Sequence, residues 1–132
     1  LLQAKGLQLK AGTVVDATLI AAPTSTKNEG KARDPDMHQS KKGNQWYFGM
    51  KAHIGVDADS GLVHSVRGTS GNVNDVIEAN GLLRGQETDA FGDAGYQGVD
   101  KRPDANNSVH AGMWHCVQDC VGLWTRTSLW MR

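Results

Sequence analysis

Apolar residues gather in three segments of the first half of the chain, and each segment predicts a strand because β-branched and aromatic residues favour a pleated, half-buried surface. The segments cover residues 14–20, 46–57 and 62–68. The second and third are joined by Asp57-Ala58-Asp59-Ser60-Gly61, where aspartate side chains can bond local backbone groups. We therefore expect three antiparallel strands in succession, and we interpret Asp57 and Asp59 as turn residues.

A helical period follows these strands. Apolar residues recur at helical spacing over 73–83, with Asn72 as the expected N-cap and Gly85 after the end. Asp75 falls in the first turn, where a negative charge suits the helix dipole. A further strand leads to Asp93, so the pattern predicts an α/β domain with a mixed sheet.

The stretch between the first two strands is polar and rich in turn formers. It has no apolar period, so we interpret residues 22–45 as a mobile loop. Basic residues outnumber acidic ones from residue 22 to residue 53, and Lys41, Lys42 and Lys51 are our candidates for gripping DNA phosphates. The alternative is a solvated surface loop.

Two aspartates end apolar segments and form the candidate metal site. Asp16 follows Thr13-Val14-Val15, and Asp93 follows Phe91-Gly92 about eighty residues later. Aspartates at the ends of neighbouring strands can hold divalent cations, and Mg²⁺ needs few protein oxygens because it keeps several waters. Two such ions roughly 4 Å apart stabilise both the attacking and the leaving oxygen when a phosphodiester is cleaved. The pair therefore points to metal-dependent chemistry on phosphodiesters.

Longer motifs surround these aspartates: residues 12–20 (GTVVDATLI), residues 43–57 (GNQWYFGMKAHIGVD) and residues 93–96 (DAGY). Over roughly residues 1–102 the chain resembles the bacterial insertion-sequence DDE transposases of the IS-five group. The resemblance implies an incomplete ribonuclease H-like fold, with three antiparallel strands, a helix and a further strand. It also implies that Asp16 and Asp93 are the first two catalytic carboxylates and hold Mg²⁺ or Mn²⁺. Double-stranded DNA, at the element ends and at the target, is the implied partner, and intact relatives are expected to be homo-oligomeric on DNA.

The third carboxylate of that family, a glutamate on a later helix, has no counterpart here. No glutamate follows Glu87, and neither Asp104 nor Asp119 lies in a comparable helical context. A site loosened by even 1 Å can lose on the order of a hundredfold in rate. We therefore expect no strand-transfer activity from this chain as written.

Composition changes after residue 102. The last thirty residues hold both cysteines and three of the four tryptophans, without a strand or helix pattern. We expect 1–102 to be a partial catalytic domain and 103–132 to be a poorly ordered tail that does not resemble the family, produced by a change of reading frame near Ala105. The alternative, a small zinc site, would use His110, His115, Cys116 and Cys120, whose spacing is a weak signal.

Four other residues have two interpretations each. His53 and His64 lie on predicted strands, where a packed, hydrogen-bonded histidine is more common than a metal ligand. Trp46 and Tyr96 could stack on a base or sugar, and we expect burial instead.

Length and charge limit the remaining choices. The 132 residues suffice for one small domain, and the first residue is leucine, so we expect an upstream portion to be missing. A formal net charge of zero argues weakly against a dedicated nucleic-acid binder. No apolar run approaches twenty residues, so we expect a cytoplasmic protein without a membrane partner. Besides a transposase fragment, two alternatives stay open: a noncatalytic DNA-binding remnant and another ribonuclease H-like nuclease.

Overall fold

The computed structural model describes residues 12–24, 26–27, 29–103 and 113–116. The candidates Asp104, His110, Asp119 and Cys120 lie outside these residues. None of the described helices is long and apolar enough to cross a membrane.

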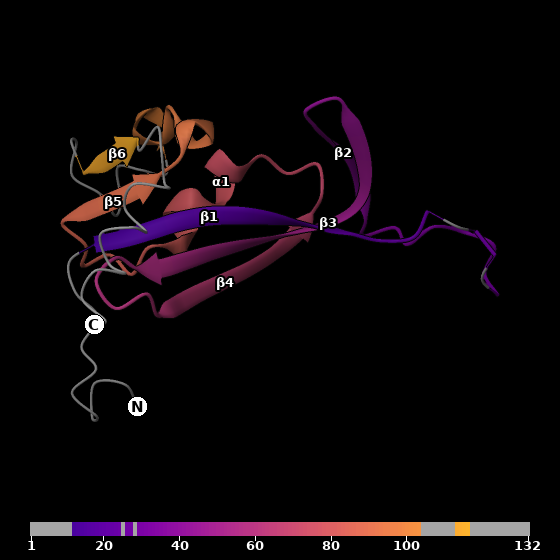
Figure 1. Cartoon of the computed structure of the whole chain (residues 1–132), viewed down its shortest axis with the longest axis horizontal. Coiled ribbons are helices and arrows are strands. Elements are labelled where there is room, and N and C mark those ends of the chain that lie inside the picture. The colour runs from indigo at the N-terminus through magenta and orange to yellow at the C-terminus, as the bar shows by residue number, and fades with distance from the viewer. Residues whose placement is uncertain (1–11, 25, 28, 104–112, 117–132) are drawn as a thin grey trace, which may run out of the picture.

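Three antiparallel strands form the centre of a mixed sheet (Figure 1). Strand β3 (Gln45–Asp57) pairs with β1 (Gly12–Ala21) on one side and with β4 (Val63–Ser70) on the other. Beyond β1, strand β5 (Asp89–Gly92) runs parallel to it. The three predicted strands are confirmed, and the mixed α/β architecture is compatible with a ribonuclease H-like fold.

The predicted helix is shorter than expected. Helix α1 covers only Asp75–Ala79 and continues as a 3-10 turn, η2 (Asn80–Leu82). Its N-cap is Asn74, whose side chain accepts a hydrogen bond from Val76 N, whereas the side chain of Asn72 bonds to Ser70 instead. The prediction of Asn72 as the cap was therefore wrong, because a nearby serine competes for its amide.

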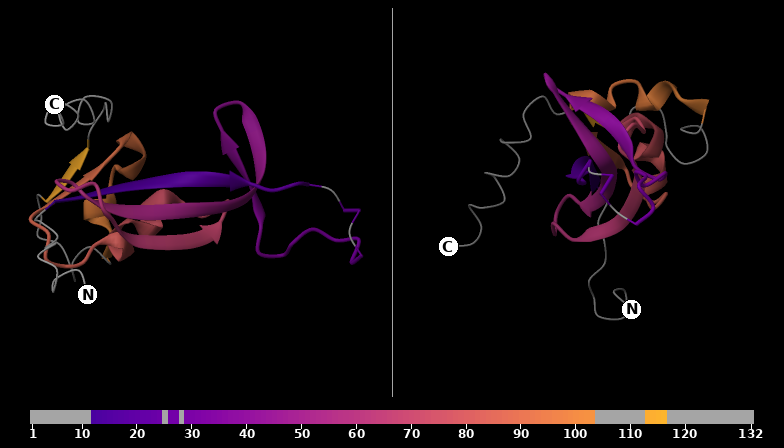
Figure 2. Two further views of the ribbon diagram at one scale, coloured as in Figure 1. Left: turned by 60° about the horizontal axis from the view of Figure 1, so that its bottom comes forward. Right: turned by 90° about the vertical axis from the view of Figure 1, so that its right-hand side faces the viewer.

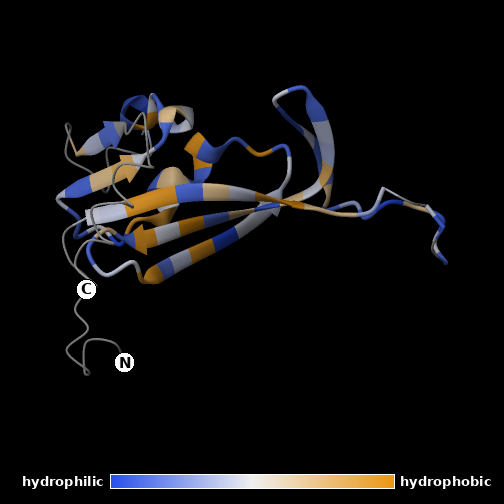
Figure 3. Ribbon diagram, in the orientation of Figure 1, coloured by the Kyte–Doolittle hydropathy of each residue, from blue (hydrophilic) through white to orange (hydrophobic). Residues whose placement is uncertain are grey.

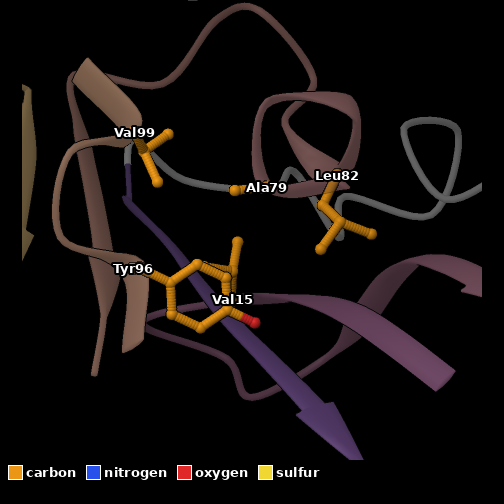
Figure 4. Packing of buried hydrophobic residues seen from close by; sticks show 5 residues of the cluster. All are labelled: Val15, Ala79, Leu82, Tyr96 and Val99. Atoms are coloured by element: carbon orange, nitrogen blue, oxygen red, sulfur yellow. The ribbon is translucent and has the colours of Figure 1, made fainter. Parts of the chain in front are cut away.

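A small core lies between the sheet and the helical segments. It contains Val15, Ala79, Leu82, Tyr96 and Val99, which come from β1, α1, η2 and the 3-10 turns η3 (Ala94–Tyr96) and η4 (Val99–Lys101). Figure 4 shows the Tyr96 ring beside Val15, with Val99 and Ala79 on the same side of β1. Figure 3 shows apolar residues along β1, β3 and β4, and of these strands β1 supplies Val15 to the cluster.

The segment expected to be a loop over 22–45 contains a strand. Strand β2 (His38–Lys42) pairs antiparallel with the first residues of β3, and Gly43, at φ 61°, turns the chain between them. Figure 2 shows this hairpin and the preceding segment projecting beyond the main sheet. Most side chains of β2 are exposed, so its sequence shows no alternation of apolar and polar residues. The strand is defined by its pairing with β3, which a sequence pattern cannot reveal.

A second strand appears where none was predicted. Strand β6 (Trp114–Cys116) runs parallel to β5, with Phe91 opposite His115. The rings of Phe91 and His115 stack with centroids 5.2 Å apart, and His115 Nε2 lies 2.8 Å from Asp89 Oδ1. At least these three residues of the tail are thus paired with the sheet.

Candidate functional site

The pairing of β1 with β5 brings the two predicted catalytic aspartates together. The parallel register sets Gly12 opposite Asp89 and Val14 opposite Phe91. Two residues further along each segment are Asp16, which is still in β1, and Asp93, which is the first residue after β5 and caps η3. Both side chains are exposed, at the point where β5 ends and β1 continues.

Local backbone bonds orient both carboxylates. Ala17 N donates to Asp16 Oδ1 at 2.8 Å, and Gly95 N donates to Asp93 Oδ1 at 2.8 Å. The second bond caps η3, so the turn after β5 fixes the direction of Asp93. A Cβ at Gly95 would lie 2.9 Å from Asp93 Oδ1, so a side chain here would turn the carboxylate away from its present direction.

Tyr96 follows Asp93 in η3, and the charges of three carboxylates influence the pKa of its hydroxyl. Its side chain is buried, as predicted, and its hydroxyl has no hydrogen-bond partner among the described residues. Burial raises the pKa of Tyr96, and the negative charges of Asp75, Asp16 and Asp93 raise it further. The hydroxyl therefore lies within electrostatic range of three aspartates from β1, α1 and the turn after β5.

Asp75 joins α1 to β3 through a polar cluster. Its Oδ1 lies 2.9 Å from Lys51 Nζ, which also donates to the Val73 carbonyl at 2.8 Å. The same oxygen lies 3.9 Å from Nδ1 of His53, a fully buried residue whose Nε2 is 2.8 Å from Thr69 Oγ1. Burial lowers the pKa of His53, although the charge of Asp75 opposes this shift. Sequence reasoning treated Asp75 as a helix-terminal residue and missed the cluster, because the spacing of Lys51 and Asp75 does not reveal their contact.

The predicted DNA contacts separate into two places. Lys41 and Lys42 are exposed on β2, whereas the side chain of Lys51 is only 16% exposed and paired with Asp75. DNA binding by all three lysines stays a prediction. The ion pair gives Lys51 a second role, which is to hold α1 against β3.

The remaining candidates are mostly structural. Asp57 accepts bonds from the backbone N and hydroxyl of Ser60, as expected for a turn residue. His64 Nε2 lies 3.2 Å from Thr13 Oγ1, as expected for a hydrogen-bonded strand histidine. The expected burial of Trp46 is wrong, since 63% of this residue is exposed on the hairpin. The apolar stretch around it predicted burial, but β2 and β3 pair there beyond the covered part of the sheet.

Asp93 borders an open hollow of about 380 Å³. The lining includes Gly92, Gln97 and Lys101, together with Trp114 and His115 from β6. One lysine, a second carboxylate (Asp100) and the rings of Tyr96, Trp114 and His115 thus line the hollow beside Asp93.

The two aspartates fit a divalent cation that keeps most of its waters. Both are exposed oxygen donors, and Mg²⁺ is commonly bound through one or two carboxylates. Within the described ranges, no group of three or more histidine, cysteine, aspartate or glutamate residues is placed to hold a metal ion. The site that the sequence predicted thus consists of two exposed carboxylates, and the binding of a cation by them stays a prediction.

The sequence matches a known protein family. The family model described as "Transposase DDE domain" matches residues 8–110, which is more than half of the chain. The chain belongs to the transposase DDE domain family. No solved structure matches it. The match contains both aspartates, α1 and the hairpin, and members of this family generally use divalent metal ions.

Proposed function

We propose that this chain carries part of the catalytic domain of an insertion-sequence DNA transposase of the IS-five group, with a ribonuclease H-like fold. The observation that supports the proposal is the parallel β1–β5 register, whose last pair, Val14 with Phe91, comes two residues before both Asp16 and Asp93. Family membership supplies the DNA partner. A cytoplasmic location and homo-oligomers on DNA are parts of the same proposal.

In this proposal, Asp16 and Asp93 hold Mg²⁺ or Mn²⁺ through the oxygens that their local backbone bonds leave available. The bound ions would supply Lewis-acid stabilisation to the attacking and leaving oxygens of the phosphodiester. Ala17 N and Gly95 N fix the two carboxylates, so little reorganisation is needed when the cation arrives. Lys41, Lys42 and Lys51 supply positive charge toward the DNA backbone, with Lys51 acting mainly through Asp75.

The chain as written is proposed to lack strand-transfer activity. The sequence holds no glutamate after Glu87, and the buried Glu87 carboxylate is already used by the fold. Asp75 is tied to Lys51 and so does not replace a free third ligand. A metal-dependent joined DNA product from the purified chain would contradict this part of the proposal.

Calorimetric titration with Mn²⁺ tests the two-carboxylate site. We expect Asp16→Asn and Asp93→Asn each to abolish measurable binding, because each variant removes one of the two carboxylate charges that the proposed site offers the ion. Folding should stay intact or improve slightly, since each change removes a charge from a repulsive pair. Asp59→Asn is the matched control, because this aspartate is exposed in the β3–β4 turn and should leave binding unchanged.

Equal affinity in the wild type and both site variants would overturn the assignment. The noncatalytic alternative predicts DNA binding without any effect of Mn²⁺. Another ribonuclease H-like nuclease would nick DNA without requiring defined element ends, so comparing DNA with and without such ends separates it from a transposase.

A further inference from the structure

The hairpin formed by β2 and residues 45–49 of β3 is a basic arm outside the candidate metal site. From residue 37 to residue 56 the sequence has no acidic residue, whereas it has Lys41, Lys42 and Lys51. Lys41 and Lys42 are exposed on the arm, and the two strands project beyond the sheet (Figure 2). The arm therefore presents a local positive charge on a chain whose formal net charge is zero.

One face of the arm combines cations with an exposed aromatic ring. The register sets Lys41 opposite Trp46, so both side chains emerge on the same face. Phe48 shares that face by alternation, and the Arg33 guanidinium lies over its ring, 5.6 Å from the centroid. Lys42 is opposite Gln45 and emerges on the other face. Arg33, Lys41 and Trp46 thus form a basic aromatic face.

Exposure of Trp46 has a chemical consequence. Trp46 is 63% exposed, so solvent reaches much of this residue, and any nucleic-acid base can stack on an accessible indole ring. Inside an intact duplex the bases are already stacked on one another, so the ring fits an unpaired base. Proteins that bind single-stranded nucleic acid combine such aromatic rings, which stack on bases, with neighbouring cations, which contact phosphates.

The distance between the arm and the candidate metal site can be estimated along β3. Strand β3 carries Trp46 and, eight residues later, Ile54, which is the Cα partner of Asp16. At 3.3 Å per residue the separation along the strand is at most about 26 Å. DNA rises about 3.4 Å per base pair, so the arm reaches DNA within about eight base pairs of a phosphate held at Asp16.

We propose that the basic aromatic face binds DNA beside the cleavage point, with Arg33 and Lys41 on phosphates and Trp46 stacked on an unpaired base. The proposal rests on the proposed function, because that function makes DNA the substrate. Lysines on an edge strand such as β2 also protect against edge-to-edge pairing. Protection alone requires neither an exposed tryptophan nor an arginine on the same face.

Fluorescence anisotropy in the presence of EDTA tests this surface without using the metal site. The probes are a labelled duplex and the same duplex with a single-stranded extension of eight nucleotides. We expect Trp46→Ala to weaken binding to the extended probe by about 5- to 100-fold and to leave duplex binding nearly unchanged. Trp46→Phe should retain most of the affinity, because a ring remains available for stacking.

Lysine variants test which face binds. We expect Lys41→Gln to lower the slope of log affinity against log salt by about one, because one phosphate contact is lost. Lys42→Gln makes the same charge change on the opposite face, where Lys42 attracts DNA without contacting a phosphate directly, so the slope should fall by clearly less than one. Equal effects of the two lysines would overturn the assignment to one face.

Equal binding of the two probes by wild type and Trp46→Ala would overturn the stacking proposal. If Trp46→Ala instead changes the sedimentation coefficient of the protein without DNA, the face is an interface between copies, and the proposal also fails. Mn²⁺ titration of the same preparations shows whether the Asp16–Asp93 site fails independently. Because the three residues of this face are exposed, none of the variants should change the thermal unfolding temperature appreciably.

Discussion

Glu87 brings a carboxylate into the interior, where neighbouring groups satisfy it. Its Oε1 accepts hydrogen bonds from the Thr13 hydroxyl at 3.0 Å and from Arg84 N at 2.6 Å, and its Oε2 accepts one from Gln86 N at 3.0 Å. Burial alone would raise the pKa of Glu87, but these hydrogen bonds outweigh it and lower the pKa. The residue therefore fastens the segment before β5 to Thr13 of β1.

We expect Glu87→Gln to destabilise the protein by about 1–3 kcal/mol at pH 7, because an amide cannot accept all of these bonds and adds an unsatisfied donor. The folded-state pKa lies below the unfolded value, so the ionised carboxylate stabilises the fold above the unfolded pKa. This contribution disappears as pH falls through the folded pKa. Urea unfolding should show a large difference between variant and wild type at pH 7 that narrows near pH 3; a constant difference would contradict the explanation.

Residues with a signal in their own stretch of sequence were predicted better than contacts between residues far apart in the sequence. Asp16 and Asp93 follow apolar runs, and a strand-end carboxylate is visible in a single stretch of sequence. The ion pair of Lys51 with Asp75 was not visible, because it depends on how α1 settles on β3. Trp46 was wrongly expected to be buried, because its neighbours in sequence are apolar while its neighbours in space leave it exposed.

The close pairing of β1, β2 and β3 at one point of the sheet depends on a glycine. Gly49 pairs with Ala21 on one side and His38 on the other, so three strands meet at this residue. A Cβ on Gly49 would overlap the Ile20 carbonyl oxygen. Any side chain here must therefore push β1 away from β3 at the base of the arm.

We expect Gly49→Ala to destabilise the protein by about 1–3 kcal/mol or more, in line with the cost of overpacking. Gly68→Ala on β4 is the matched control, because no atom lies within 4 Å of a Cβ built there. That variant should be neutral or slightly more stable, since alanine reduces the freedom of the unfolded chain. Chemical unfolding of both variants checks the prediction, and similar stabilities would show that this point of the sheet tolerates a side chain.

Elements with their own pattern were predicted well. Strands β1, β3 and β4 show clear apolar runs, whereas β2 is mostly exposed and exists through its bonds to β3. Helix α1 ends earlier than predicted because the expected helical run includes Gly81. The Cα of this glycine faces the Arg67 guanidinium, and the chain continues there as a 3-10 turn. Periodicity therefore located the helix without fixing its length.

Across the whole molecule, two histidines make folding sensitive to acid. Burial lowers the pKa of both His53 and His64, and the charge of Arg84 lowers that of His64 further. A basic group with a lowered folded-state pKa stabilises the fold fully above its unfolded pKa, about 6.5. This stabilisation is lost as pH falls below that value, because the unfolded chain then takes up the protons more readily.

The thermal unfolding temperature should therefore fall between pH 7 and pH 5, by about 4–8 °C for each kcal/mol lost. His53→Gln should flatten this fall, because glutamine does not titrate. NMR titration of the ring protons provides an independent measurement, in which both histidines should titrate below pH 6.5. Ordinary titration of both rings in the folded protein would contradict the assignment.

The order of elements was also predicted at this scale, because three antiparallel strands, a helix and a further strand each have a local signal. The last strand and its partner were not predicted. Strand β6 lies in a segment whose composition gave no strand pattern, and only its pairing with β5 defines it. Long-range pairing is a property of the assembled sheet, so single-sequence patterns do not contain it.

The parallel pairing of β1 with β5 also sets when the carboxylate pair forms in a growing chain. Asp16 and Asp93 are about eighty residues apart, and the β-meander and α1 lie between them. At roughly 5–20 residues per second, a ribosome adds the second aspartate about 4–16 s after the first. During that interval β1 can already pair with β3, but the metal pair does not yet exist. A nascent chain can thus complete the hairpin of β2 and β3 before it has both aspartates of the proposed metal site.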